Sequence, residues 1–204
     1  MCGRYYVDDD TAKEIEKLVR QAEEKSSASQ ALKLLPTDIH PTQTAPVLAA
    51  VDKGSRICCR MQRWGFLVPG GKKTGGKLIF NARSETAAEQ RMFFEAVACR
   101  RAVIPATWFY EWNRNKEKNI FYRKEKKVLF MAGIYNLYPD GEHFVILTTR
   151  ANESMEPVHS RMPLLLEEEE ILPWIVQPDL TQDFLRKIPN RLERRFEYEQ
   201  ISLF

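Results

Sequence analysis

The sequence of 204 residues is long enough for one domain or at most two small ones, and its 44% hydrophobic and 29% charged residues are typical of a folded globular protein. This composition excludes collagen-like, disordered and coiled-coil chains, and apolar runs such as Ala45–Val51 are far shorter than the roughly 20 residues of a membrane-spanning helix. The net charge is only +3, yet residues 56–127 carry 17 Lys and Arg against 6 Asp and Glu, which predicts either a local field that attracts a polyanion or simply a solvated basic surface.

In the first half of the chain, short apolar runs predict strands at Gly3–Val7, Val47–Val51 and Ser55–Phe66. Apolar residues at helical spacing predict a helix over residues 11–25, capped by Asp10 or Thr11. Between these elements we expect a polar break, a proline-rich irregular segment and a basic glycine-rich loop, at Ser26–Gln30, Pro36–Pro46 and Pro69–Lys77.

The second half begins with a predicted short helix at Thr86–Val97, which is followed by five predicted strands at Ala102–Ile104, Thr107–Trp112, Ile120–Arg123, Val128–Tyr135 and His143–Thr149. Two terminal helices are predicted at Glu167–Val176 and Leu180–Ile188. Many short strands with few helices indicate one α+β domain over residues 1–204, built around a curved, barrel-like and mostly antiparallel sheet with peripheral helices. Residues 167–204 would form its C-terminal helices and tail.

Cys2 is the first candidate for chemistry, because a small second residue generally permits removal of the initiator methionine. Cys2 would then carry an α-amine and a thiol on adjacent carbons, with reference pKa values of about 7.7–8.0 and 8.5, so we expect useful fractions of both nucleophiles near neutrality. Such a pair can form a Schiff base with an aldehyde and close it to a thiazolidine ring, or it can attack an amide. The alternative is a frayed N-terminus without a chemical role.

A polar segment follows the predicted basic loop. Asn81, Arg83 and Glu85 alternate and would face one side of an extended chain, where Asn81 would orient an amine and Arg83 would hold a phosphate. The alternative is a helix start with Ser84 as its cap and a supporting ion pair.

Glu111 is the only carboxylate in the aromatic run Thr107–Trp112. Burial among aromatic rings would disfavour its charged form and make it a candidate proton donor, while neighbouring rings could stack bases. The alternative is an exposed strand residue paired with Arg114.

Of the three histidines, His159 is the best candidate for acid–base chemistry, because it lies in a loop bracketed by Pro157 and Pro163. A solvated side chain is its alternative role. His143 is expected at the surface or edge of a strand, and His40 has no clear role. The cysteines lack zinc or disulfide spacing. Because no residue cluster of the sequence requires a metal or an organic cofactor, we expect neither.

Taken together and in this order, five motifs resemble the SOS response-associated peptidase (SRAP) family of abasic-site processing proteins, namely Met1–Tyr5, Asn81–Glu85, Arg101–Trp112, Thr148–Asn152 and His159–Pro163. The resemblance extends over residues 2–166. It implies a barrel-like sheet with a basic groove for single-stranded DNA, and a thiazolidine crosslink between Cys2 and the ring-opened aldehyde of an abasic site. It also implies roles in DNA repair and the SOS response to DNA damage, with thiol (auto)peptidase activity.

The resemblance assigns individual roles as well. Cys2 would be the nucleophile, Asn81 would position its amine, Glu111 would transfer protons, and His159 would assist opening of the sugar ring. The DNA-binding surface would comprise Arg4, Arg83, Trp112, Thr149 and Arg161. Two other hypotheses stay open: an N-terminal-cysteine peptidase, and a module that binds single-stranded DNA without covalent chemistry. Because no signal peptide is visible, we expect a cytoplasmic monomer that does not contact membranes.

Overall fold

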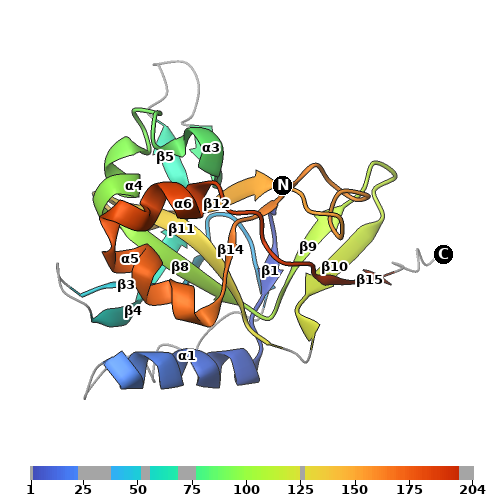
Figure 1. Cartoon of the computed structure of the whole chain (residues 1–204), viewed down its shortest axis with the longest axis horizontal. Helices are drawn as coiled ribbons and strands as arrows, with labels where there is room; N and C mark the ends of the chain where they lie inside the picture. Colours follow the sequence, from blue (N-terminus) through green and yellow to red (C-terminus); the bar gives the residue numbers. More distant parts are fainter. Residues whose placement is uncertain (1, 23–37, 52–55, 69–76, 125–126, 198–204) are drawn as a thin grey trace.

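Strands dominate the part of the chain that the computed structural model describes, which comprises residues 2–22, 38–51, 56–68, 77–124 and 127–197 (Figure 1). Five of them close into a barrel in the order β12 (Gly141–Arg150), β4 (Ile57–Trp64), β3 (Thr44–Ala50), β8 (Arg101–Ala106) and β11 (Leu129–Tyr138), which returns to β12. These pairings are antiparallel except β4–β12. The predicted fold class is therefore confirmed, with a sheet that closes on itself.

Shorter strands extend this barrel. β7 (Asn81–Arg83) pairs in parallel with β12, β13 (Arg161–Pro163) pairs with β12, and β14 (Leu165–Leu166) pairs with β11. A small hairpin joins β5 (Phe66–Val68) to β6 (Lys77–Ile79). β7 lies in the Asn81–Glu85 motif and β13 lies in the His159–Pro163 motif, so both polar motifs lie beside β12.

A second sheet contains the N-terminal strand. Its order is β15 (Glu193–Glu197), β10 (Lys118–Tyr122), β9 (Trp108–Trp112), β1 (Tyr5–Tyr6) and β2 (Asp38–Ile39), with every pairing antiparallel. β1 lies between β9 and β2, so its backbone is paired on both sides. The start of the chain is therefore an inner strand of a sheet.

Alternating side chains of the barrel strands enter two apolar clusters. One contains Leu48 and Val103 together with residues of five helices, α1 (Asp9–Ala22), α3 (Ser84–Ala87), α4 (Phe94–Cys99), α5 (Ile171–Val176) and α6 (Thr181–Leu185). The other contains Ile104 with Phe109 of the second sheet, and it includes Cys2. Each large side chain buried in this way contributes roughly 1.5–3 kcal/mol. In Figure 1, α5 lies over β8, which it contacts.

Several element boundaries differ from the sequence-based prediction. The predicted helix Thr86–Val97 is two short helices, α3 (Ser84–Ala87) and α4, separated by a turn. Helix α1 begins at Asp9, since Asp8 Oδ1 accepts the Thr11 N–H at 2.7 Å and acts as the cap instead of Asp10 or Thr11. The segment Pro36–Pro46, expected to be irregular, contains β2 and the start of β3.

The terminal helices are also shorter than predicted. Single 3₁₀ turns at Glu168–Glu170 and Pro178–Leu180 precede α5 and α6. Pro178 begins the second of these turns, where its missing N–H is tolerated. Ser26–Gln30 and nearly all of Pro69–Lys77 lie outside the described residues. Among the residues described, no helix is long and apolar enough to cross a membrane.

His143 is buried, and its expected place at a surface or edge is wrong. Only 1% of it is exposed, and its strand β12 is not an edge strand, because β12 pairs with β11 on one side and with β4 on the other. The ring donates from Nδ1 to the Gly65 carbonyl at 2.8 Å, and Nε2 lies 3.1 Å from Asp140 Oδ1. This side chain therefore links both partners of the parallel pair that closes the barrel.

Candidate active site

The pairing of β1 with β9 brings the backbone at the start of the chain alongside Glu111. Tyr5 lies opposite Phe109, and the Tyr110 N–H donates to the Arg4 carbonyl at 3.0 Å. Continuing this antiparallel register towards the start of the chain sets Gly3 opposite Glu111. Cys2 is only 1% exposed, so it is not part of a frayed terminus.

Asn81 holds the backbone of Cys2. Its Nδ2 donates to the Cys2 carbonyl at 2.8 Å across 79 positions of sequence, while β7 fixes Asn81 opposite Ile146 of β12. The Asn81 Oδ1 is buried and has no hydrogen-bond partner among the described residues. The amide nitrogen of Asn81 thus anchors Cys2, and the amide oxygen is an acceptor for an N–H group beside Cys2.

Glu111 is buried on the inward side of β9. It is 5% exposed and lies opposite Asn119 of β10, on the same side of the strand as Phe109. An exposed Glu111 paired with Arg114 is therefore wrong, because the strand turns alternate side chains into the core. The charge of Glu111 acts on the Cys2 thiol, which places the two groups within electrostatic reach.

The Cys2 thiol is strongly held in its protonated form. Burial, and after it the negative charge of Glu111, raises the pKa of Cys2 to about 12. The thiol lies 3.8 Å from the Arg4 carbonyl, to which it donates. The expectation of a useful thiolate fraction near neutrality is therefore wrong for the folded chain, and a base must take the thiol proton when the sulfur reacts.

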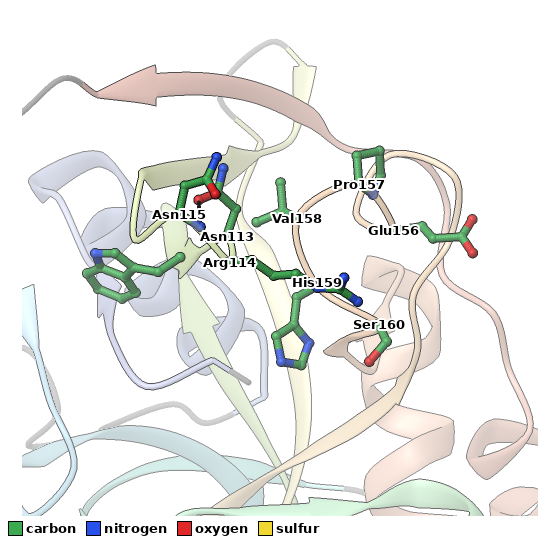
Figure 2. Close-up of a pocket in the computed structure, with 9 residues that line it drawn as sticks. Asn113, Arg114, Asn115, Glu156, Pro157, Val158, His159 and Ser160 are labelled. Atoms are coloured by element: carbon green, nitrogen blue, oxygen red, sulfur yellow. Dashed lines mark hydrogen bonds between the residues drawn. The ribbon is translucent and has the colours of Figure 1, made fainter.

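His159 lies in a pocket of about 740 Å³ that is lined by Trp112, the turn Asn113–Asn115 and the loop Glu156–Ser160 (Figure 2). Arg114 extends from the turn after β9 towards the loop that carries His159. The Arg161 N–H donates to His159 Nδ1 at 2.9 Å, and the Arg161 carbonyl lies 3.3 Å from the same nitrogen. The bond from the N–H is the shorter contact and requires Nδ1 as its acceptor, so the neutral ring carries its proton on Nε2.

The His159 loop is packed against the Cys2 end of the core. Met155 and Val158 belong to the same apolar cluster as Cys2, and both are buried. Trp112 of the pocket directly follows Glu111 on β9. The structure thus brings Cys2, Asn81 and Glu111 together, and it places His159 in the adjoining pocket.

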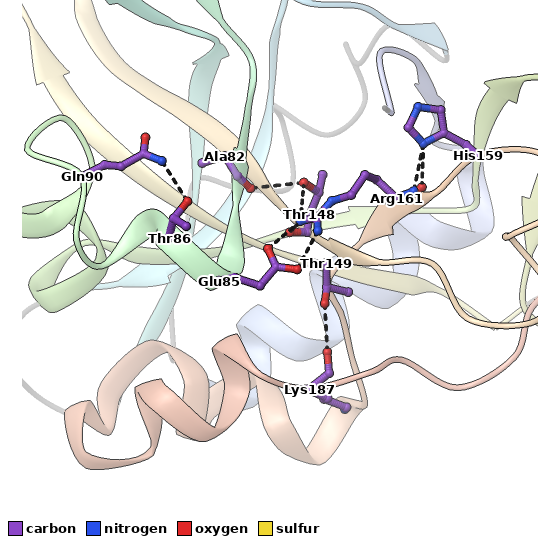
Figure 3. A network of polar contacts seen from close by, with 9 residues as sticks. All are labelled: Ala82, Glu85, Thr86, Gln90, Thr148, Thr149, His159, Arg161 and Lys187. Atoms are coloured by element: carbon purple, nitrogen blue, oxygen red, sulfur yellow. Dashed lines mark hydrogen bonds and ion pairs between the residues drawn. The ribbon is translucent and has the colours of Figure 1, made fainter.

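Arg161 is the centre of a polar network (Figure 3). Its guanidinium donates to both carboxylate oxygens of Glu85, at 2.6 and 2.8 Å, and also to the Thr148 carbonyl. Because of this pairing the pKa of Glu85 is lowered. The expected ion pair of the Asn81–Glu85 segment thus exists, but Ser84 is not the cap, since Arg83 occupies the cap position without a side-chain bond.

The expected DNA-contacting residues differ in exposure. Arg83 is exposed at the end of β7, and Trp112 forms part of the pocket wall. Arg4 pairs with Asp38 and lies over the Tyr110 ring, with its guanidinium carbon 4.8 Å from the ring centroid.

Thr149 is the residue whose expected role the structure argues against. It is only 4% exposed, and its hydroxyl donates to the Lys187 carbonyl at 3.3 Å. The guanidinium of Arg161 is likewise occupied by protein acceptors, which gives it a structural task.

Sequence reasoning missed the turn Asn113–Asn115 as a wall of the pocket. Its signal was present, because a polar turn directly after an aromatic strand is where functional loops often lie. Within the described residues, no group of three or more His, Cys, Asp or Glu side chains is placed to hold a metal ion.

The barrel, with Cys2 buried beside Asn81 and Glu111, is the fold and site of a known protein family. The sequence profile described as "SOS response associated peptidase (SRAP)" matches residues 1–202, and the chain belongs to this family. The resemblance found in the motifs is therefore confirmed.

Individual relatives agree with this assignment. The chain is 34% identical over 162 residues to the abasic site processing protein YoqW of Bacillus subtilis (strain 168), covering 74% of this chain and 71% of that one. It is 30% identical over 197 residues to the abasic site processing protein HMCES of Rattus norvegicus, covering 72% of this chain and 55% of that one. A crystal structure of a protein from Bacteroides thetaiotaomicron shares the fold, with a TM-score of 0.75 at 22% identity over 97% of this chain and 93% of that chain.

Proposed function

We propose that this protein binds single-stranded DNA and, once Met1 has been removed, joins Cys2 to the ring-opened aldehyde of an abasic site as a thiazolidine. The observation that carries the proposal is the anchoring of Cys2 by Asn81 in a buried site beside Glu111. An aminothiol is suited to an aldehyde, and the names of the relatives specify abasic sites as what those proteins process. Such a link would shield the lesion during the response to DNA damage.

The chemistry would proceed in two bond-forming stages. The α-amine of Cys2 adds to the aldehyde carbon, and loss of water gives a Schiff base. The sulfur then adds to the same carbon, the electron pair of the C=N bond moves to nitrogen, and the thiol proton passes through a base to that nitrogen, which becomes the ring N–H. Glu111, whose charge acts on the Cys2 thiol, is the candidate for that base, and Asn81 Oδ1 would accept an N–H of the amine.

His159 would act on the closed sugar of the abasic site, before the Cys2 amine reacts with the aldehyde. The closed sugar of an abasic site must open to expose its aldehyde, and a donor at the ring oxygen assists that step. The neutral His159 ring carries its proton on Nε2, because Nδ1 is occupied by the Arg161 N–H. Arg83 and Trp112 would hold the flanking strand through a phosphate contact and base stacking.

The test uses the mature protein and a single-stranded oligonucleotide with one abasic site, analysed on a denaturing gel and by intact mass. We expect one covalent adduct whose mass is the sum of the two molecules less one water. Cys2→Ser should abolish the stable adduct, and the matched variant Cys99→Ser, at an exposed cysteine, should retain it.

An absent adduct, or one that persists in Cys2→Ser, would reject the proposal. Salt-sensitive DNA binding without an adduct would instead indicate a non-covalent binding module. Turnover of a peptide in trans without a DNA adduct would indicate an N-terminal-cysteine peptidase.

A further inference from the structure

The hydroxyl of Tyr5 is a buried polar group that has no role in the chemical steps proposed above. Tyr5 is 0% exposed, and its side-chain oxygen has no hydrogen-bond partner among the described residues. A phenol in this condition is less favourable than a phenylalanine ring of the same shape, because its O–H has given up water without gaining a partner. Packing alone therefore does not account for the oxygen.

The Tyr5 side chain faces the compartment of Cys2 and Glu111. Tyr5 lies opposite Phe109, so it shares the inward side of the sheet with Glu111, which lies two residues further along β9. Its ring centroid is 5.2 Å from that of Trp64, and the Trp64 indole donates to the Phe80 carbonyl at 2.8 Å. Phe80 precedes the Asn81 that anchors Cys2, and Tyr5 and Cys2 belong to one apolar cluster.

Tyr5 is suited to be a donor in this place. Burial raises its pKa well above the ordinary value, and negative charge on Cys2 raises that pKa further. The phenol therefore keeps its proton while the sulfur becomes more negative. A sulfur that loses its proton in a buried site requires such a donor, because no water solvates the charge there.

We infer that the Tyr5 hydroxyl donates a hydrogen bond to the Cys2 sulfur as this sulfur attacks the Schiff base. The inference rests on the proposed function and adds a residue to it. Tyr5 keeps its proton throughout: the thiol proton leaves to the base, the C–S bond forms, the C=N electron pair returns to nitrogen, and the base delivers its proton to that nitrogen. Tyr5 would thus accelerate ring closure without affecting Schiff-base formation.

Tyr5→Phe is the direct test, since it removes one oxygen and keeps the ring against Trp64. Tyr6→Phe is the matched control, because the Tyr6 ring stacks on Trp108 at 4.2 Å on the opposite side of the same strand. Each mature variant is given two aldehydes: abasic single-stranded DNA, and acetaldehyde without DNA. Borohydride trapping measures the Schiff base, and mass mapping of the N-terminal peptide measures the thiazolidine.

We expect Tyr5→Phe to slow ring closure about 10- to 100-fold with both aldehydes, the rate equivalent of one hydrogen bond to a charged group, with borohydride trapping unchanged. Tyr6→Phe should close at the wild-type rate. Slow closure of Tyr5→Phe with acetaldehyde, in a protein that forms no adduct with DNA, would support the inference about the sulfur and reject the proposed DNA substrate.

Wild-type closure rates in Tyr5→Phe would overturn the inference. A lower unfolding temperature in Tyr5→Phe, accompanied by equal losses of trapping and closure, would overturn it as well, because the hydroxyl would then have a structural role.

Discussion

At the scale of single residues, Asn81 has the most constrained position in the site. It donates to the Cys2 carbonyl while β12 fixes its own backbone, so the amide sets where the reactive terminus lies. Proximity of this kind supplies much of the rate in reactions between bound groups.

Asn81→Ala should therefore lower the crosslinking rate by about 10- to 100-fold, the loss expected from misplacing a reacting group. Quantifying adduct formation over time on a denaturing gel measures this. Gln90→Ala, which removes an exposed amide that bonds only Thr86, is the control. Equal rates in both variants would contradict the positioning role of Asn81.

The buried thiol of Cys2 and the half-buried thiol of Cys59 predict a loss of stability in alkali. Burial raises the pKa of Cys2 and that of Cys59 to about 12, above the value of about 8.5 for an unfolded cysteine. The folded chain therefore binds more protons than the unfolded chain between these values. Their stabilisation is complete below about pH 8.5 and decreases as the pH rises towards 12, by up to roughly 1.4 kcal/mol per pH unit for each thiol.

Urea unfolding at pH 8, 9 and 10 tests this expectation. Cys59→Ala should show a smaller alkaline loss than the wild type, whereas Cys99→Ala, at an exposed thiol, should show the same loss. An unchanged slope in Cys59→Ala would show that this thiol does not cause the loss.

At the scale of elements, the Glu85–Arg161 pair joins α3 to β13, and the Arg161 backbone holds His159. Glu85→Gln should loosen that hold and slow crosslinking about 5-fold, the equivalent of roughly 1 kcal/mol. Glu95→Gln, which weakens the exposed pair Glu95–Arg100, is the matched control and should have no effect. Single-turnover crosslinking of closed-ring abasic DNA is the measurement, and equal rates would refute the coupling.

The parallel pair that closes the barrel predicts a stability effect. His143→Leu removes the donor to the Gly65 carbonyl and leaves that acceptor unpaired, so we expect a loss of about 2–3 kcal/mol. His40→Leu, at a half-exposed side chain, is the control and should be nearly neutral. Urea unfolding measures both, and similar losses in the two variants would exclude a special role of the buried ring.

At the scale of the whole molecule, charge is distributed unevenly along the chain. Residues 56–127 have a net charge of +11 and residues 128–204 a net charge of −6. Exposed basic groups near the site would attract DNA phosphates, and each contact releases counterions.

DNA affinity should therefore fall linearly on a logarithmic salt scale, by about 0.7 in slope for each phosphate contact on single strands. Arg83→Ala should reduce the slope by about 0.7, while Arg186→Ala, in the acidic part, should leave it unchanged. Fluorescence anisotropy with an intact oligonucleotide measures the slope. Equal slopes for the wild type and Arg83→Ala would show that Arg83 does not contact DNA phosphates.

The sequence was sufficient for features that depend on local pattern. Alternating apolar residues located most strands, and the motifs around Cys2 and Glu111 indicated the family. The predicted boundaries failed at the turn between α3 and α4, where local hydrogen bonds close the turn and the Phe93 ring packs against the distant Phe66. The prediction for His143 was wrong because the composition of a strand does not reveal whether neighbouring strands pair with both of its edges.

By itself, the sequence determined which groups are available: a cysteine at position 2, an amide, a carboxylate, a histidine and a basic middle region. Only the tertiary structure decided their state. It buries Cys2, so that its thiol pKa rises to about 12, and it fixes the His159 tautomer through the Arg161 N–H. The physical reason is that protonation and hydrogen bonding depend on solvent exclusion and on partners distant in sequence, such as Asn81 and Cys2, which are 79 positions apart.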